Sequence, residues 1–118
     1  MYIDLKLDKE VKKYLFILNQ IFEIEKKVNR LEERNSINRN TKKLMEFFEE
    51  SMSDYISFIV ENPIDESYNE TRTDVEASIS GNESENLIIV EVIKPIIRIK
   101  SGKLNQIVQK AIVIVESK

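Results

Sequence analysis

The chain has 118 residues, of which 33% are charged, and its 18 basic and 21 acidic side chains give a formal charge of −3. This length suits one ordinary domain, or a helical oligomerisation segment with a very small domain attached. Cysteine and histidine are absent, which excludes disulfides, thiol catalysis, imidazole bases and the usual zinc ligands. The charge balance provides no large basic surface, so we predict no nucleic-acid partner.

The apolar runs are too short to span a bilayer, and the amino-terminal residues lack the basic and then apolar layout of a signal peptide. We therefore expect no membrane association and a cytoplasmic location. The acids between Asp65 and Glu76 lack the tight spacing of calcium or magnesium ligands, so we predict that they are solvated and that no metal binds.

From Leu7 to Leu31, apolar residues recur every three or four positions, which predicts one long amphipathic helix. Such a stripe needs a partner surface, because an isolated helix gains most of its stability by burying its apolar face. We favour a homodimer over an intramolecular hairpin, and the pattern leaves parallel or antiparallel pairing open. The residues predicted to mediate dimerisation are Val11, Tyr14, Leu18, Ile21, Val28 and Leu31.

A polar run over residues 35–40 predicts either a loop or a weak point in a continuous helix. Helical spacing resumes at Asn40 or Thr41 and continues to Asn62, where the restriction that Pro63 places on the preceding residue ends the helix. Residues 1–62 are therefore predicted to form a helical dimerisation region.

After Pro63 the pattern changes to that of β-strands. Short segments that alternate apolar and polar residues, or that are rich in β-branched residues, lie at 75–79, 87–93, 96–100 and 107–115. Turn residues such as Gly81 and Gly102 separate these segments. We predict a small all-β domain over residues 63–118, and an α+β fold with the helices first and the strands second.

Three phrases of the strand-rich half carry a family resemblance. They are Asp74-Val-Glu-Ala77, Ile89-Val-Glu91-Val92 and Ala111-Ile-Val113-Ile-Val115, and Glu66-Ser-Tyr68-Asn69 precedes them in the chain. In these phrases and in its layout, the chain resembles the GrpE family of nucleotide-exchange cochaperones, which combine a long paired helix, a shorter helical segment and a small β domain. The family's motif histidine is absent, and Gln109-Lys110 stands in place of its Arg-Pro.

The resemblance implies a protein that opens the ATPase domain of a DnaK-type chaperone and so releases ADP, with no cofactor and no catalysis of its own. It further implies that the β domain contacts the chaperone, and the predicted partner-binding residues are Arg72, Lys94, Ile97 and Arg98. The alternative is a coiled-coil scaffold that presents the β domain to another protein. An enzyme with Glu76 and Glu91 as acid and base is disfavoured, because so small a domain has little room for a pocket.

Overall fold

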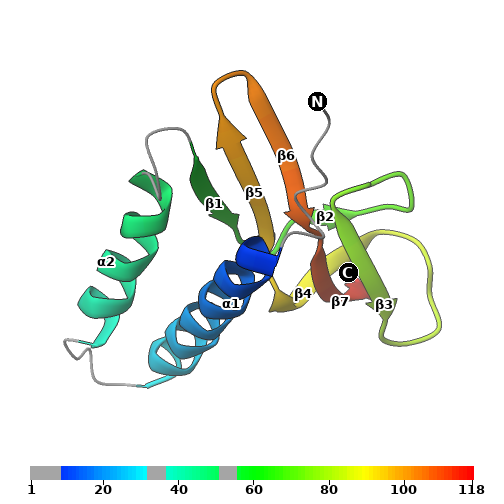
Figure 1. Cartoon of the computed structure of the whole chain (residues 1–118). Helices are drawn as coiled ribbons and strands as arrows, with labels where there is room; N and C mark the ends of the chain where they lie inside the picture. Colours follow the sequence, from blue (N-terminus) through cyan, green and yellow to red (C-terminus); the bar gives the residue numbers. More distant parts are fainter. Residues whose placement is uncertain (1–8, 32–36, 51–55) are drawn as a thin grey trace.

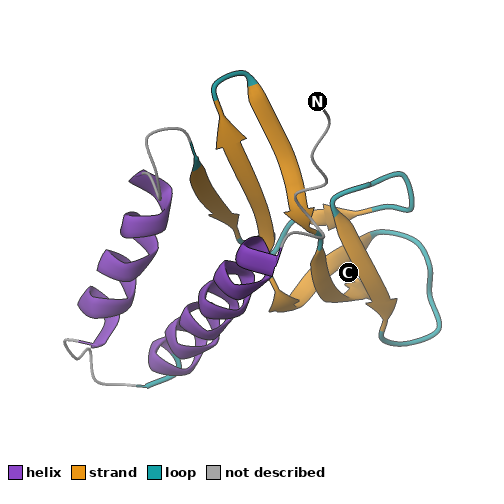
Figure 2. Ribbon diagram, viewed as in Figure 1, coloured by secondary structure: helices purple, strands orange, loops and turns teal. Residues whose placement is uncertain are grey.

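A computed structural model of the chain describes residues 9–31, 37–50 and 56–118. Its helices are α1 (Lys9–Asn29) and α2 (Ile37–Glu50). Its strands are β1 (Ser57–Glu61), β2 (Ser67–Tyr68), β3 (Val75–Ile79), β4 (Leu87–Lys94), β5 (Ile96–Ser101), β6 (Leu104–Gln109) and β7 (Ala111–Ser117). Helices therefore precede strands, which confirms the predicted α+β class (Figure 1, Figure 2).

A long, bent antiparallel ribbon organises the strands. β4 continues into β5 across Pro95, and β6 continues into β7 across Lys110, so that β5 pairs with β6 and β4 pairs with β7. Strand β1 completes a three-stranded sheet of order β1-β5-β6, and the other sheet has the order β2-β4-β7-β3. The ribbon changes sheet at Pro95 because proline has no amide hydrogen to donate to a ladder.

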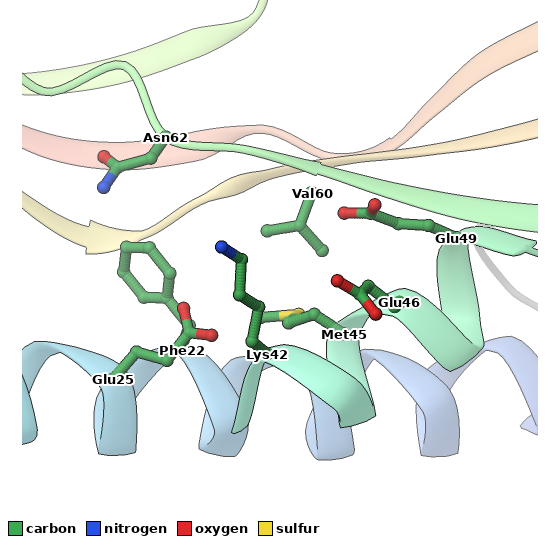
Figure 3. A pocket seen from close by; sticks show the side chains of 8 residues that line it. All are labelled: Phe22, Glu25, Lys42, Met45, Glu46, Glu49, Val60 and Asn62. Atoms are coloured by element: carbon green, nitrogen blue, oxygen red, sulfur yellow. The ribbon is translucent and has the colours of Figure 1, made fainter. Parts of the chain in front are cut away.

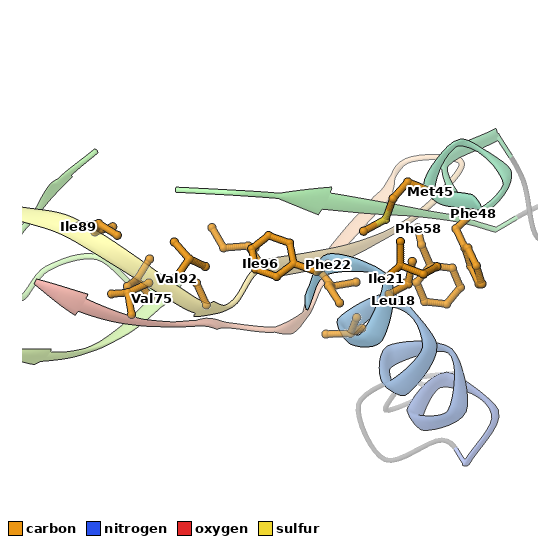
Figure 4. Packing of buried hydrophobic residues seen from close by; sticks show 14 of the residues in the cluster. Leu18, Ile21, Phe22, Met45, Phe48, Phe58, Val75, Ile89, Val92 and Ile96 are labelled. Carbon is orange, nitrogen blue, oxygen red and sulfur yellow. The ribbon is translucent and has the colours of Figure 1, made fainter. Parts of the chain in front are cut away.

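The apolar stripe of α1 is buried against the strands. Leu18, Ile21 and Phe22 are at most 4% exposed, and they share one buried cluster with Phe58 of β1 and Ile99 of β5. Figure 4 shows this cluster continuing from the helices along the ribbon into the four-stranded sheet. The two sheets and both helices thus share a single hydrophobic core.

This packing gives the predicted dimerisation stripe a partner within the chain. Four of its six residues are buried: Val11, Leu18, Ile21 and Val28. Tyr14 packs against the core, with its ring centroid 6.2 Å from that of Phe48 and 5.5 Å from that of Phe58. Leu31 is 56% exposed. A homodimer remains a prediction, and it would need a surface other than this stripe, because the stripe already packs on the chain's own sheet.

Polar side chains fix the position of α1 along the ribbon. The amides of Asn19 and Gln109 exchange two hydrogen bonds, with N···O distances of 2.8 and 2.9 Å. Gln109 Nε2 also donates to the Pro95 carbonyl at 2.9 Å, and Lys26 Nζ donates to the Val92 carbonyl at 2.8 Å. These bonds satisfy polar groups beside the bend of the ribbon and set the register between helix and strands.

The predicted second helix is too long. α2 ends at Glu50, and residues 57–61, predicted to be helical, form strand β1 instead. In this strand Phe58 lies opposite Ile99 and Val60 lies opposite Ile97. Two adjacent β-branched residues, Ile59 and Val60, favour a strand, and pairing with β5 outweighs the helical spacing. Residues 37–40 of the predicted loop are helical, whereas residues 32–36 and 51–55 lie outside the described residues.

The strand predictions were right in type and incomplete in number. The segment predicted as one strand over 107–115 is divided at Lys110 into β6 and β7, and β1 and β2 were not predicted. Strand β1 lies before the predicted domain boundary at residues 62 and 63, yet it pairs with β5 beyond that boundary. The segments on the two sides of the boundary are joined by sheet pairing as well as by the core.

Replacing Leu18 with alanine should lower the free energy of unfolding by about 3 kcal/mol, because the side chain is fully buried and leaves a cavity. Leu31→Ala is the matched control, and its effect should stay within about 0.5 kcal/mol. Urea unfolding followed by circular dichroism measures both. Equal losses for the two variants would contradict the packing of α1 on the sheet.

Candidate functional site

Arg72, one of the predicted partner-binding residues, forms a clamp within the chain. Its Nε and Nη2 atoms each donate to the Asp74 carboxylate at 3.0 Å, and Nη1 donates to the Ser67 carbonyl at 3.0 Å. Nη1 also lies 3.3 Å from a carboxylate oxygen of Glu66. Donating to the Asp74 carboxylate raises the pKa of Arg72, and accepting the same bonds holds the pKa of Asp74 below its ordinary value. Arg72 therefore joins β2 to the start of β3.

The other three predicted contacts lie near one another in the chain but in different environments. Ile97 is fully buried in the core, so its side chain is not part of the surface. Arg98 on β5 donates through Nε to Glu61 on the neighbouring strand β1. Lys94 is exposed at the end of β4. The structure therefore does not gather the four residues into one surface, and Lys94 is the exposed residue among them.

Strand β4 contains two irregularities that change which side chains reach solvent. Its pairing with β7 shifts between Ile89 and Glu91, and again between Val92 and Lys94. At each shift one extra residue of β4, Val90 or Ile93, is inserted without a partner in β7. Such β-bulges interrupt the alternation of a strand and redirect side chains. As a result, β4 is buried at every third residue here and not at every second.

The bulges bring apolar side chains to the surface of the four-stranded sheet. Val90 and Ile93 are each 42% exposed. Ile114 and Ile112 of β7 are half-buried, and the register places Ile114 opposite Glu91 and Ile112 opposite Lys94. We call this set the outer sheet face. It consists of Val90, Glu91, Ile93, Lys94, Ile112 and Ile114.

The outer sheet face has the composition of a protein-binding surface. Four of its six side chains are apolar, and Glu91 and Lys94 supply one charge of each sign beside them. A mixture of exposed apolar groups with a few charges is typical of surfaces that bind other proteins.

Sequence reasoning identified only Lys94 of this face. The run from Leu87 to Ile93 contains six apolar residues and Glu91, which is equally typical of a strand buried on both sides. The available signal was the apolar run itself, because one small core cannot cover both faces of such a strand. The sequence does not show where the bulges fall, since they depend on pairing with β7.

Two other kinds of site can be assessed on the described residues. No group of three or more acidic side chains there is arranged to hold a metal ion. Within residues 9–31, 37–50 and 56–118, neither helix combines the length and the apolar character that crossing a bilayer requires.

We compared the chain with protein-family models, with curated proteins and with solved structures, and none of the three comparisons found a match.

The clamp between Arg72 and Asp74 should make stability depend on pH. Because the folded-state pKa of Asp74 is lowered, its stabilising contribution is present above the unfolded pKa of about 3.9 and is lost as pH falls through the folded value. Arg72→Met should cost about 1 kcal/mol at pH 7 and less at pH 3. Urea unfolding at both pH values measures this, with Lys100→Met as the control. A loss independent of pH would rule out the electrostatic role.

Proposed function

We propose that this protein binds another protein through the outer sheet face and acts as a GrpE-like nucleotide-exchange factor for a DnaK-type chaperone. One observation carries the proposal. The three phrases that resemble the family, at residues 74–77, 89–92 and 111–115, fall on β3, β4 and β7. These strands are neighbours in one sheet, in the order β4-β7-β3. The segments that resemble the family therefore form a single structural unit.

The position of each phrase within that unit supports the proposal further. Val75 lies opposite Ala111 and Ala77 lies opposite Val113 in the parallel pair of β3 and β7. Val92 lies opposite Val113 on the other side of β7. Apolar residues of the three phrases thus build a common inner face of the sheet. Other residues of β4 and β7 form the outer sheet face.

The proposed mechanism is a shift of conformational populations. A protein that binds the open form of an ATPase domain more tightly than its closed, ADP-holding form shifts the population toward opening and speeds ADP release. By reciprocity, ADP weakens the binding of the exchange factor by the same factor. No group of the exchange factor needs to touch the nucleotide, so this role requires neither a catalytic residue nor a cofactor.

The alternative function is a scaffold that presents the β unit to a different protein. The same outer sheet face would serve it, because exposed Val90 and Ile93 favour protein contact without specifying the partner. The two functions differ in one measurable respect, which is whether ADP leaves a chaperone faster.

The decisive experiment measures release of a fluorescent ADP analogue from the source organism's DnaK-type chaperones, chased with ATP, with and without this protein. We expect acceleration, and we expect Ile93→Asp to reduce it by about tenfold, because a charge in the centre of an apolar contact must be desolvated. Ile93 is already 42% exposed, so the variant should fold. Point variants are preferable to a truncation, because the helices and strands share one core.

Leu104→Asp provides the matched control, since Leu104 is 46% exposed but lies on β6, outside the outer sheet face. It should accelerate release as well as the unaltered chain does. If no chaperone of the source organism releases ADP faster, nucleotide exchange is wrong, and the scaffold function remains. If the two aspartate variants lose activity equally, the outer sheet face is not the contact surface.

A further inference from the structure

A cleft of about 270 Å³ opens where α1, α2 and β1 meet. Phe22 of α1 and Met45 of α2 are buried beneath it, and half-buried Val60 of β1 closes one side. Together these side chains provide an apolar floor. The cleft is separate from the outer sheet face, because neither β4 nor β7 contributes a lining residue.

The rim of the cleft carries an excess of negative charge. Glu25, Glu46 and Glu49 contribute three carboxylates, and Lys42 contributes one ammonium group, which leaves a net charge of −2. Figure 3 shows Glu25 on α1 and the other three side chains along α2, with Lys42 extending toward the strand. In the described part of the chain, none of these four groups forms an ion pair within 4.0 Å.

The cleft destabilises the ionised form of Glu25. Burial raises the pKa of the Glu25 carboxyl, a hydrogen bond from Thr41 opposes that shift, and the charge of Glu49 adds to it. A half-buried carboxylate near another carboxylate is stabilised when a cation approaches. Among the described residues that line the cleft, Lys42 is the one cation beside the three acids.

These features select a class of ligand. An anion is disfavoured by the net charge, and a purely apolar ligand would leave the carboxylates beside it without a partner. A bare divalent cation is disfavoured, since the three carboxylates, like all the described acids, do not converge into a metal-binding group. An alkyl chain that ends in an ammonium group satisfies both parts of the cleft. Its methylenes would cover Phe22 and Met45, and its head group would reach the rim carboxylates.

We propose that the cleft between α1, α2 and β1 binds an alkylammonium group. Two sources carry this chemistry, a free aliphatic diamine or polyamine and the lysine side chain of another protein. Lys42 belongs to the same chemical class as the ligand and lies in the cleft, so it competes with the ligand through like-charge repulsion. The site is independent of nucleotide exchange and of the outer sheet face.

The experiment titrates the isotope-labelled full chain and follows its amide resonances by nuclear magnetic resonance. The probes are cadaverine, for a free diamine, and N-acetyl-lysine N-methylamide, for a lysine side chain. Two control compounds each lack one part of the ligand. Pentanol has an alkyl chain without the positive charge, and methylammonium has the charge without the long alkyl chain. We expect both probes to shift resonances of α1, α2 and β1 and both controls to leave them unchanged. The tighter of the two probes identifies the source.

Variants that remove either the negative or the positive charges of the rim test whether the net negative charge of the cleft governs binding. Glu46→Gln combined with Glu49→Gln should weaken binding about fivefold or more, and Lys42→Met should strengthen it by a similar factor. Glu76→Gln, an exposed acid on β3, should change nothing. All these positions are exposed, so the variants should fold, which circular dichroism checks.

The proposal is overturned by any of three results. Lys42→Met weakens binding, pentanol binds as well as cadaverine, or the double glutamine variant binds both probes unchanged. Because the ADP-release assay uses a different surface, failure of either proposal leaves the other intact.

Discussion

The packing of α1 on the bent ribbon is the constraint on which the rest of this structure depends. Leu18 is fully buried between the helix and the strands, and it belongs to the same cluster as Phe58 and Ile99. Around it, the amide pair of Asn19 and Gln109 fixes the position of the helix along the ribbon. Hydrophobic contact supplies most of the stability, while these hydrogen bonds select one register, because an amide left buried without a partner is costly. Without this contact, the apolar stripe of α1 would lose the strand residues that share its buried cluster.

The bend at Pro95 divides the ribbon into two parts that belong to different sheets. On one side, β5 and β6 receive β1 and support both helices, which creates the cleft beside Phe22 and Val60. On the other side, β4 and β7 form the centre of the four-stranded sheet. The bulges of β4 turn part of an otherwise buried strand toward solvent. The bend of the ribbon, at Pro95 on one strand and at Lys110 on the other, thus separates the cleft from the outer sheet face.

The charged side chains of the chain have different roles that composition does not distinguish. Arg72 binds Asp74 and the Ser67 carbonyl, and Arg98 binds Glu61, so both stabilise connections within the fold. Lys94 and Lys42 are exposed on the outer sheet face and in the cleft. Arginine suits the first role, since its planar group makes several directed hydrogen bonds at once. The number of bonds that a cation makes within the fold decides whether it remains available to a partner.

The sequence by itself determined the α+β class, the presence of a first helix and the position of most strands, because these follow from local periodicity and from proline and glycine. Only the tertiary structure decided which surfaces those elements pack against and which strands they pair with. The stripe from Val11 to Val28 must be covered in any fold, but its spacing does not say whether a second chain or the chain's own sheet covers it. Residues 57–61 could be helix or strand by pattern, and pairing with β5 decided the matter. The bulges of β4 and the burial of Ile97 depend on register between distant segments, which no local pattern encodes.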